Sequence, residues 1–446
     1  MNTVAFLVYT DTITILRFIM VAAELATMGV SSTFICLTPR SRTITRQILE
    51  RECPNMDVPC HNFFLPLWRR ILHRMLSRIS AFCFRGYSFR LGNVPSKDCR
   101  KANEPDILAD LFDFNIDVSI GKFCSNQLHW WHVHLKQADG ILQSIRPGAV
   151  VYDVELVDQI RMVLLQSLRR QIPIISMQHG EGFGEQYLHF PVLADHYIAY
   201  SPYNVDKIRS IGVEETRIHL TGNPDTDRLY RLDAAKIRNE LETTYGLDLN
   251  RTIVLVALRP SYDTVSRHDN TKLIRTIVQE LGSDDRFLVL VKPHNSDHVV
   301  GLTPLYTTHG SDNVLVLPAD FTIAKLIRIS HYQLTHMSSC IVEGVLLGLT
   351  PIVIASEDGG TWPPWHEHDV YVTIPPESIA ETLRQIKSGT LAFRYTDQNR
   401  EKFVHRFRYR MDDRSSNRVA TTIRKILHEN QGIPIDHEWS LAERTC

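Results

Sequence analysis

The chain alternates short apolar runs with helical stretches, and this alternation constrains its fold more than any other feature. Runs rich in Val, Ile, Leu and Phe are separated by segments whose apolar residues recur at helical spacing. This rhythm favours a parallel sheet with helices on both faces, because parallel strands need long crossover connections. The strands predicted in the first half are 4–9, 32–37, 149–152, 173–177, 195–200 and 218–221.

A second series of strands follows a polar, helix-rich stretch at 225–250. Its predicted strands are 252–257, 287–291, 314–317, 332–335, 352–354 and 370–373, and one long helix or two follow at about 399–430. The 446 residues suffice for two domains that each bury a core. We therefore expect an N-terminal Rossmann-like domain at 1–225, a C-terminal domain at 226–400 and a helical tail at 401–446.

Composition excludes several classes of protein. Lys plus Arg number 49 and Asp plus Glu number 50, so a broad nucleic-acid-binding surface is not indicated. The eight cysteines form no C-x-x-C pair, which indicates neither a zinc module nor a redox pair. Scattered cysteines in a long chain are typical of reduced thiols, and they predict a cytoplasmic protein.

An arginine-rich insertion interrupts the N-terminal half at 63–90. It has no acidic residue, and Arg70, Arg74 and Arg78 recur at helical spacing opposite aromatic and aliphatic side chains. Two interpretations stay open: a helix that lies on the anionic inner face of a membrane, or an amphipathic helix packed on the domain. No uncharged run approaches the roughly 20 residues of a membrane span, so we expect a soluble or peripheral protein.

Five polar segments lie at the ends of predicted strands, where open parallel sheets place their ligand sites. They are 178–182 (Q-H-G-E-G), 221–224 (T-G-N-P), 257–261 (A-L-R-P-S), 292–295 (K-P-H-N) and 338–343 (S-S-C-I-V-E). In the last of these, Ser338 and Ser339 precede a predicted helix whose free backbone N–H groups favour a phosphate. Glu343 follows about one turn later and can accept hydrogen bonds from a ribose. The pattern predicts a nucleotide-linked substrate.

The order of these segments resembles the GT-B superfamily of nucleotide-sugar enzymes. The nearest likeness is to the branch with non-hydrolysing UDP-N-acetylglucosamine 2-epimerases, capsule glycosyltransferases and CDP-glycerol glycerophosphotransferases. The resemblance covers about 145–375, and in the N-terminal third only the opening β-α-β unit. It implies two Rossmann-like parallel-sheet domains that face a central cleft. It also implies a donor nucleotide held mainly by the C-terminal domain and a helical tail that packs back toward the N-terminal one.

The resemblance also implies which residues bind the donor. Ser338 and Ser339 would contact its phosphate and Glu343 its ribose, while Arg259 would offset the charge that builds on the leaving nucleotide. The K-P-H element resembles the K-P-H-P of capsule transferases, with Asn295 in place of the second proline, and together with the double serine it favours a CMP- or CDP-linked donor over a UDP-linked one. The full predicted donor set is Gly222, Asn223, Arg259, Lys292, His294, Ser338, Ser339 and Glu343, with no metal and no cofactor.

His179 and Glu181 are the predicted catalytic residues. Both follow a predicted strand of the N-terminal half, and a histidine is the natural base near pH 7, with glutamate next. The alternative is a glycine-rich connection in which His179 caps a helix or is satisfied in the core.

The sequence therefore predicts a metal-independent glycosyltransferase. It would move a sugar or polyol-phosphate from a nucleotide donor to a glycan or lipid-linked acceptor in surface polysaccharide synthesis. The first alternative is a non-hydrolysing UDP-sugar 2-epimerase, although the segment from Leu258 to Ser261 does not match that family's H-R-x-E-N element. The second is a catalytically silent GT-B-like binding subunit.

Overall fold

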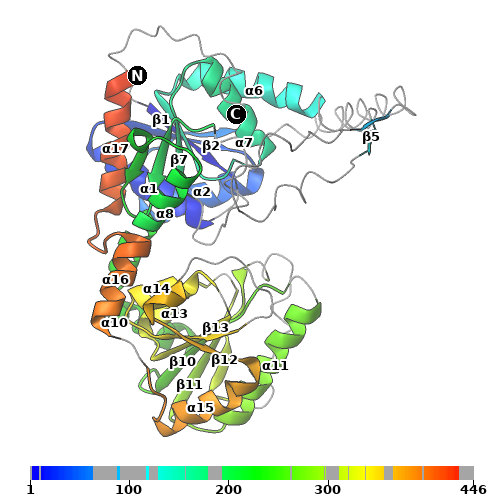
Figure 1. Cartoon of the computed structure of the whole chain (residues 1–446), viewed down its shortest axis with the longest axis vertical. Coiled ribbons are helices and arrows are strands. Elements are labelled where there is room, and N and C mark those ends of the chain that lie inside the picture. Colours follow the sequence, from blue (N-terminus) through cyan, green and yellow to red (C-terminus); the bar gives the residue numbers. More distant parts are fainter. Residues whose placement is uncertain are drawn as a thin grey trace. The chain divides into compact units, whose positions relative to one another are not determined.

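A computed structural model of the chain describes most of the two predicted α/β halves (Figure 1). The described residues are 3–9, 12–63, 88–90, 117–119, 129–155, 157–178, 193–261, 264–295, 297, 311–319, 321–336, 338–355, 365–393 and 396–430. Residues 64–87 of the arginine-rich insertion lie outside these ranges, as do His179 and Glu181. None of the described helices is long and apolar enough to cross a membrane.

The first sheet has seven strands in the order β3-β2-β1-β6-β7-β8-β9. They are β1 (Thr3–Val8), β2 (Ser31–Cys36), β3 (Cys60–Asn62), β6 (Ala149–Tyr152), β7 (Ile174–Met177), β8 (His196–Ala199) and β9 (Ile218–Leu220). The pairs with a determined register are parallel, as the continuous apolar runs predict for strands buried on both faces. The connecting helices are α1 (Thr12–Thr27), α2 (Pro39–Glu52), α6 (His129–Ile145), α7 (Asp158–Arg169) and α8 (Pro202–Ser210).

The second sheet has six strands in the order β12-β11-β10-β13-β14-β15. They are β10 (Thr252–Ala257), β11 (Phe287–Lys292), β12 (Val314–Val316), β13 (Tyr332–His336), β14 (Pro351–Ile354) and β15 (Val372–Ile374). All of its neighbouring pairs are parallel. The first strand of this sheet in the sequence, β10, lies in its middle. The chain then adds β11 and β12 on one side and β13, β14 and β15 on the other, so the strand order reverses between β10 and β13. Ligands of doubly wound sheets bind at this reversal, beyond the carboxyl ends of the strands.

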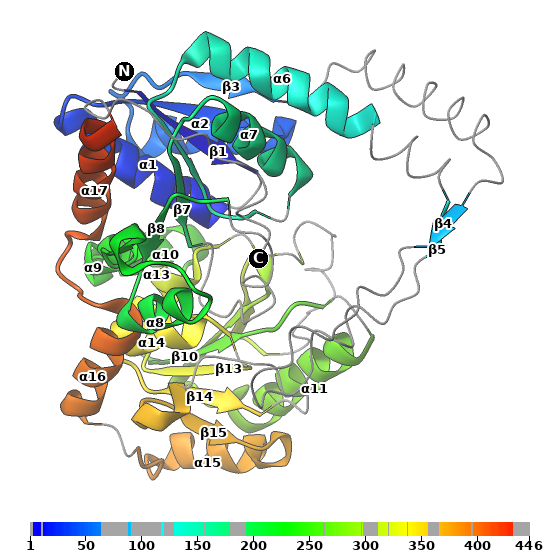
Figure 2. The ribbon, with the colours of Figure 1, turned by 45° about the horizontal axis from the view of Figure 1, so that its top comes forward.

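Helices cover both faces of the second sheet (Figures 1 and 2). Val254 and Val256 of β10 share a core with α11 (Thr264–Leu281) and α15 (Ile379–Ser388). Ile253 and Leu255 of the same strand point the other way, into a core with α10 (Ala234–Tyr245) and α13 (Ile323–Ile329). Successive side chains of a strand point to opposite faces, so one apolar strand supplies both cores.

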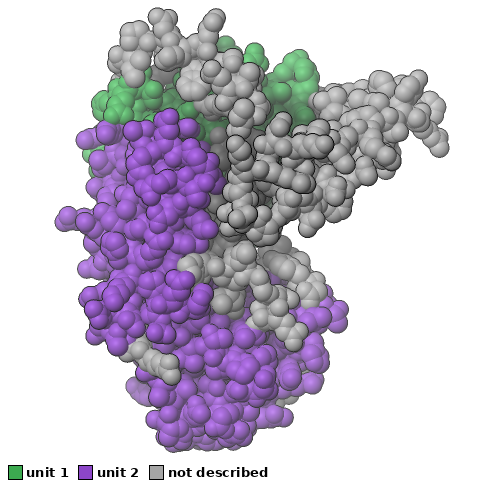
Figure 3. Space-filling model, in the orientation of Figure 1, with its two compact units in different colours: residues 1–177, 192–196, 426–438 green, residues 178–191, 197–425, 439–446 purple. Residues whose placement is uncertain are grey.

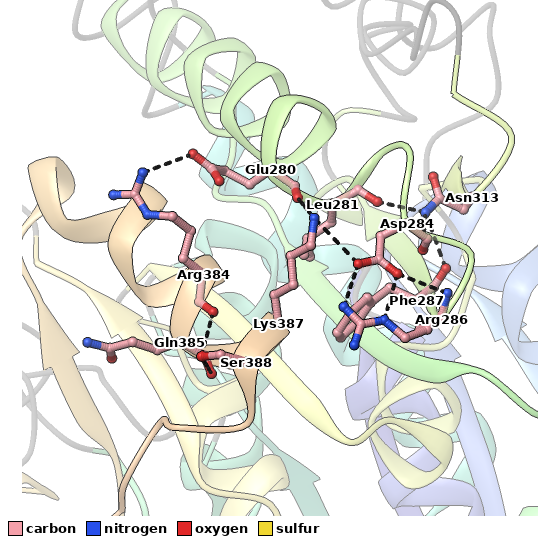
Figure 4. A network of polar contacts seen from close by, with 10 residues as sticks. All are labelled: Glu280, Leu281, Asp284, Arg286, Phe287, Asn313, Arg384, Gln385, Lys387 and Ser388. Carbon is pink, nitrogen blue, oxygen red and sulfur yellow. Dashed lines mark hydrogen bonds and ion pairs between the residues drawn. The ribbon is translucent and has the colours of Figure 1, made fainter.

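Polar contacts close the amino-terminal edge of the second sheet (Figure 4). The carboxylate of Asp284 accepts hydrogen bonds from Arg286 at 2.7 and 2.9 Å and lies 3.4 Å from Nζ of Lys387 on α15. The side-chain amide of Asn313 donates to the carbonyl groups of Leu281 at 2.7 Å and of Asp284 at 3.0 Å. This edge is therefore occupied by contacts that join α11, β11, β12 and α15.

The chain divides into two compact units (Figure 3). The first comprises residues 1–177, 192–196 and 426–438, and the second comprises 178–191, 197–425 and 439–446. The units do not follow the sheets, because β9 belongs to the first sheet but to the second unit. The domain boundaries expected from the sequence, 1–225, 226–400 and 401–446, stay a prediction.

The predicted strands agree with the structure to within two residues at each end. Three short strands were not predicted: β3, and the antiparallel pair of β4 (Ser88–Arg90) and β5 (Asp117–Ser119). The stretch at 225–250 forms α9 (Pro224–Tyr230) and α10, and the tail forms α16 (Asp397–Arg408) and α17 (Ser415–Asn430). Within the described ranges, the remaining helical elements are α14 (Cys340–Leu346) and the 3₁₀ turns Glu215–Arg217, Trp365–His368 and Pro376–Ser378.

Candidate anion site at the second sheet

Arg259 and His336 flank the point where the strand order of the second sheet reverses. Ala257, the last residue of β10, lies opposite Thr335 of β13 in the parallel register. Arg259 follows two residues after Ala257, and His336 follows directly after Thr335, so both stand at the carboxyl edge. The topology therefore brings a guanidinium and an imidazole together at the place where this fold binds ligands.

Arg259 is held in place but keeps one donor open. Its Nη2 donates to Oδ2 of Asp269 on α11 at 2.7 Å, and its carbonyl group accepts from the side-chain amide of Asn270 at 2.9 Å. Its Nε is buried and has no hydrogen-bond partner among the described residues. A fixed guanidinium with a free N–H suits an anionic ligand.

His336 is buried in an environment that disfavours its charged form. The side chain is 8% exposed. Burial, and next the positive charge of Arg259, lower the pKa of His336 to about 4, although Asp269 opposes the shift. The imidazole is therefore neutral near pH 7, with one nitrogen as a donor and the other as an acceptor.

A buried carboxylate ties the loop after β10 to the loop after β11. Asp297 is fully buried and accepts hydrogen bonds from the backbone N–H and the hydroxyl of Ser261, both at 3.1 Å. The side-chain amide of Asn270 also donates to the hydroxyl of Ser261 at 3.1 Å. These bonds fix the segment that carries Arg259 relative to the segment that carries His294.

Lys292 and His294 differ in what they can offer a ligand. The ammonium group of Lys292 is buried and donates to the carbonyl groups of Pro293 and Ala319, each at 2.6 Å, and to Oδ1 of Asn295 at 2.9 Å. Because an ammonium has three donors, this geometry favours a role in fixing the loop over the predicted contact with the nucleotide. His294 is half-buried, and burial lowers its pKa below the usual value.

The residues predicted to contact the phosphate and the ribose follow His336 in the chain. Ser338 is half-buried, and its hydroxyl accepts a long hydrogen bond of 3.4 Å from the N–H of Cys340. Ser339 is exposed and precedes α14, where its hydroxyl makes no capping bond. Glu343 is half-buried in the first turn of α14. The next residue is Gly344, where an added Cβ would collide with Oε1 of Gln333. The hydroxyls of both serines are near the carboxyl edge.

Gly222 and Asn223 are engaged in packing. Asn223 is buried and caps α9 by accepting a hydrogen bond from the N–H of Asp225 at 3.0 Å. Gly222 has a φ of +86°, and a Cβ there would lie 2.7 Å from Oγ of Ser415 at the start of α17. These contacts explain the T-G-N-P segment within the fold, and its predicted contact with the donor stays a prediction.

The first sheet carries acidic groups at its own point of reversal, between β1 and β6. Asp153 follows β6 and accepts a hydrogen bond at 2.8 Å from the hydroxyl of Thr14, in the first turn of α1. Glu155 accepts from the N–H of Leu193 at 2.7 Å and from the hydroxyl of Tyr152 at 3.3 Å. Burial raises the pKa of Glu155 to about 7, so this carboxyl group can exchange a proton near neutral pH.

Two members of the site at the second sheet, His336 and Asp269, are not among the residues predicted from the sequence, and Glu155 of the first sheet is not among them either. His336 and Glu155 both follow predicted strands, and this position was the available signal. The pairing of Asp269 with Arg259 depends on how α11 packs and had no local signal.

The arrangement at the second sheet suits recognition of a phosphate. It combines the guanidinium of Arg259, the neutral imidazole of His336 and the hydroxyls of Ser338 and Ser339 at the edge of a sheet. The profile of the UDP-N-acetylglucosamine 2-epimerase family matches residues 134–424, a range that contains this edge and most of the second unit, together with residues 134–177 and 192–196 of the first. The chain belongs to the UDP-N-acetylglucosamine 2-epimerase family.

Solved structures agree with this family and with the GT-B fold. The UDP-GlcNAc 2-epimerase of Neisseria meningitidis bound to UDP-GlcNAc has 13% identity and a TM-score of 0.60, over 95% of this chain and 100% of that chain. The UDP-GlcNAc 2-epimerase of Methanocaldococcus jannaschii has 11% identity and a TM-score of 0.59, over 95% and 99%. A glycosyltransferase of Rickettsia africae has 11% identity and a TM-score of 0.53, over 97% and 99%. No curated protein sequence matches the chain.

These findings confirm the predicted superfamily and fold. The chain is a nucleotide-sugar enzyme of the GT-B fold, built on two parallel α/β sheets. They support the epimerase alternative more directly than the predicted glycosyltransferase, because transferases are similar to the chain only at the level of the fold.

Proposed function

We propose that this protein binds a UDP-linked N-acetylhexosamine and inverts the configuration at C2 of the sugar. The observation that carries the proposal is the family match over 134–424, which spans Arg259, His336 and the Ser338–Ser339 segment. The site at the second sheet would hold the diphosphate of the substrate.

Inversion at C2 needs a good leaving group at C1. As the bond from C1 to the nucleotide breaks, C1 becomes electron-poor and the proton on C2 becomes acidic. Loss of the C2 proton and of UDP leaves a double bond between C1 and C2. A proton then adds to the opposite face of C2 and UDP adds back to C1, so the C1–O bond re-forms and the net reaction needs no acceptor. Arg259 would lower the barrier by stabilising the charge that develops on the departing diphosphate.

The nucleotide is proposed to be UDP, where the sequence pattern alone favoured CMP or CDP. The family's name and the bound UDP-GlcNAc of the Neisseria meningitidis enzyme support the change. The K-P-H element suggested CMP or CDP, but it supports those nucleotides less because the three donors of Lys292 bond to oxygens of Pro293, Asn295 and Ala319.

Glycosyl transfer to an acceptor is the second candidate. It also requires a stabilised nucleotide leaving group, so the site at the second sheet fits both reactions. The observation that favours it is the segment from Leu258 to Ser261, which departs from the H-R-x-E-N element expected of the epimerases. The two reactions differ in whether the sugar leaves the nucleotide for good.

Incubation with UDP-GlcNAc in D₂O, without an acceptor, tests the proposal. We expect proton NMR to reveal the C2 epimer and loss of the C2 proton signal through exchange with solvent. Arg259→Met should lower the rate by about 10²-fold, as loss of a group that stabilises transition-state charge does elsewhere. If UDP-GlcNAc keeps its C2 proton and UDP is released only when a glycan acceptor is added, the transferase hypothesis replaces the epimerase.

A further inference from the structure

The carboxyl end of β13 leaves hydrogen-bonding atoms open in a buried place. His336 is 8% exposed, and neither its Nδ1 nor its Nε2 has a partner in the part of the chain that the structure describes. The buried Nε of Arg259 likewise has no hydrogen-bond partner among the described residues. Buried polar atoms are nearly always paired in folded proteins, so open atoms on two neighbouring strand ends point to a ligand.

The same charged groups surround the unpartnered atoms of His336 and Arg259. Arg259, in the loop after β10, and Asp269, on α11, are the charged groups that act on the imidazole of His336. Further titratable groups of this edge are Lys292, His294 and Asp297, at and after the end of β11, and Glu343, on α14. Asp269 occupies Nη2 of Arg259 and leaves Nε to face another acceptor.

We propose that His336 binds a phosphate oxygen of the nucleotide directly, beside Nε of Arg259. The inference rests on the proposed function, because a nucleoside diphosphate is the anion that this function brings to the edge. A phosphate oxygen can accept hydrogen bonds from both side chains, and it would satisfy donors that are otherwise buried and open. His336 thereby joins Arg259 as a residue that binds the leaving group.

Binding should change the protonation of His336. In the free protein, burial and Arg259 keep the imidazole neutral. A phosphate next to the ring adds negative charge, which favours the imidazolium and raises the pKa of His336 in the complex. UDP should therefore bind together with a proton, and its affinity should rise as the pH falls from 8 toward 6.

Isothermal titration calorimetry with UDP tests the inference on the full chain. Titrations in two buffers with different ionisation enthalpies give the number of protons taken up per UDP. The variants are His336→Gln and His336→Asn, whose amides can replace Nε2 and Nδ1 respectively but cannot titrate. The matched control is His331→Asn, directly before the start of the same strand, where the amide oxygen can still accept the hydrogen bond that Nδ1 accepts from the N–H of Ile253.

We expect the wild type and His331→Asn to take up protons with UDP. Both His336 variants should lose this proton uptake. The variant whose amide does not occupy the position of the imidazole nitrogen that contacts the phosphate should bind UDP about 10- to 100-fold more weakly than the wild type. Unchanged melting temperatures without ligand would exclude misfolding of the variants. If both His336 variants bind UDP with wild-type affinity and proton uptake, the inference is wrong while nucleotide binding stands.

Inorganic pyrophosphate separates the inference from the proposed function. If UDP does not bind the wild type but pyrophosphate binds with proton uptake that His336→Gln lacks, the anion site is retained and the nucleotide proposal fails. If neither UDP nor pyrophosphate binds, both proposals fail.

Discussion

Glu155 is the residue whose titration should be visible in the stability of the fold. Its pKa of about 7 lies above the ordinary 4.5, so the folded chain binds the proton more tightly than the unfolded chain does. The stabilisation is complete below pH 4.5 and is lost as the pH rises through 7. The difference corresponds to roughly 3 kcal/mol at most, and on the order of 2 kcal/mol for a half-buried group.

Glu155→Gln should remove this pH dependence, because the amide stays neutral. Urea unfolding at pH 5 and pH 8 measures the effect. From pH 5 to pH 8, the free energy of unfolding of the variant should rise by about 2 kcal/mol relative to that of the wild type. Glu214→Gln, at an exposed position, is the control and should change little. A parallel profile for wild type and Glu155→Gln would mean that the carboxyl group is ionised in the folded chain.

The site was predictable at the level of strand ends but not at the level of single donors. Arg259, His294 and the Ser338–Ser339 pair all lie at the expected edge. Lys292 looked equally suited to a phosphate, yet its three donors go to oxygens of neighbouring loops. His336 was not among the predicted residues, because its place beside Arg259 depends on the register between β13 and β10. Motif spacing does not reveal which donors the fold has already used.

At the scale of elements, Gly222 joins the end of the first sheet to α17. Its φ of +86° disfavours any side chain, and a Cβ would also lie 2.7 Å from Oγ of Ser415. Gly222→Ala should therefore lower the free energy of unfolding by about 1–2 kcal/mol through backbone strain. It should lower it further because the added methyl group displaces α17. Gly212→Ala is a matched control, with a φ of +87° and no heavy atom within 4 Å of the added Cβ.

Thermal or urea unfolding of the two glycine variants separates the cost of backbone strain from the cost of displacing α17. Gly212→Ala should show the backbone cost alone, and Gly222→Ala a clearly larger loss. Equal losses would mean that α17 can move away from residue 222 without cost.

The long elements followed from periodicity and the short ones did not. The apolar strands were predicted within two residues because burial on both faces leaves a continuous signature. Strand β3 is only Cys60-His61-Asn62, which lacks that signature and pairs at the edge of the sheet. The tail divides into α16 and α17 where Tyr409 and Asp413 adopt positive φ angles of 68° and 58°. A positive φ is uncommon for a tyrosine, so the residue type at Tyr409 carried no signal of this break.

At the scale of the whole molecule, fold and chemistry were not equally predictable. Two series of strands implied two doubly wound sheets, and the family and the solved structures confirm the GT-B fold. The choice between epimerase and transferase depends on what meets the sugar, whereas the motifs of the sequence mostly report on the nucleotide. Both reactions share a leaving diphosphate, so the same strand-end pattern serves either.

Nucleotide binding at the second sheet is the central claim, and the melting temperature of the full chain tests it most directly. UDP, CDP, CMP and GDP are each added to the wild type and to Arg259→Met. We expect UDP to raise the melting temperature of the wild type the most, by a stabilisation of about 2.7 kcal/mol at 100 times its Kd, and Arg259→Met to lose most of this shift. An equal response to all four nucleotides, or a UDP shift that Arg259→Met retains in full, would contradict the account.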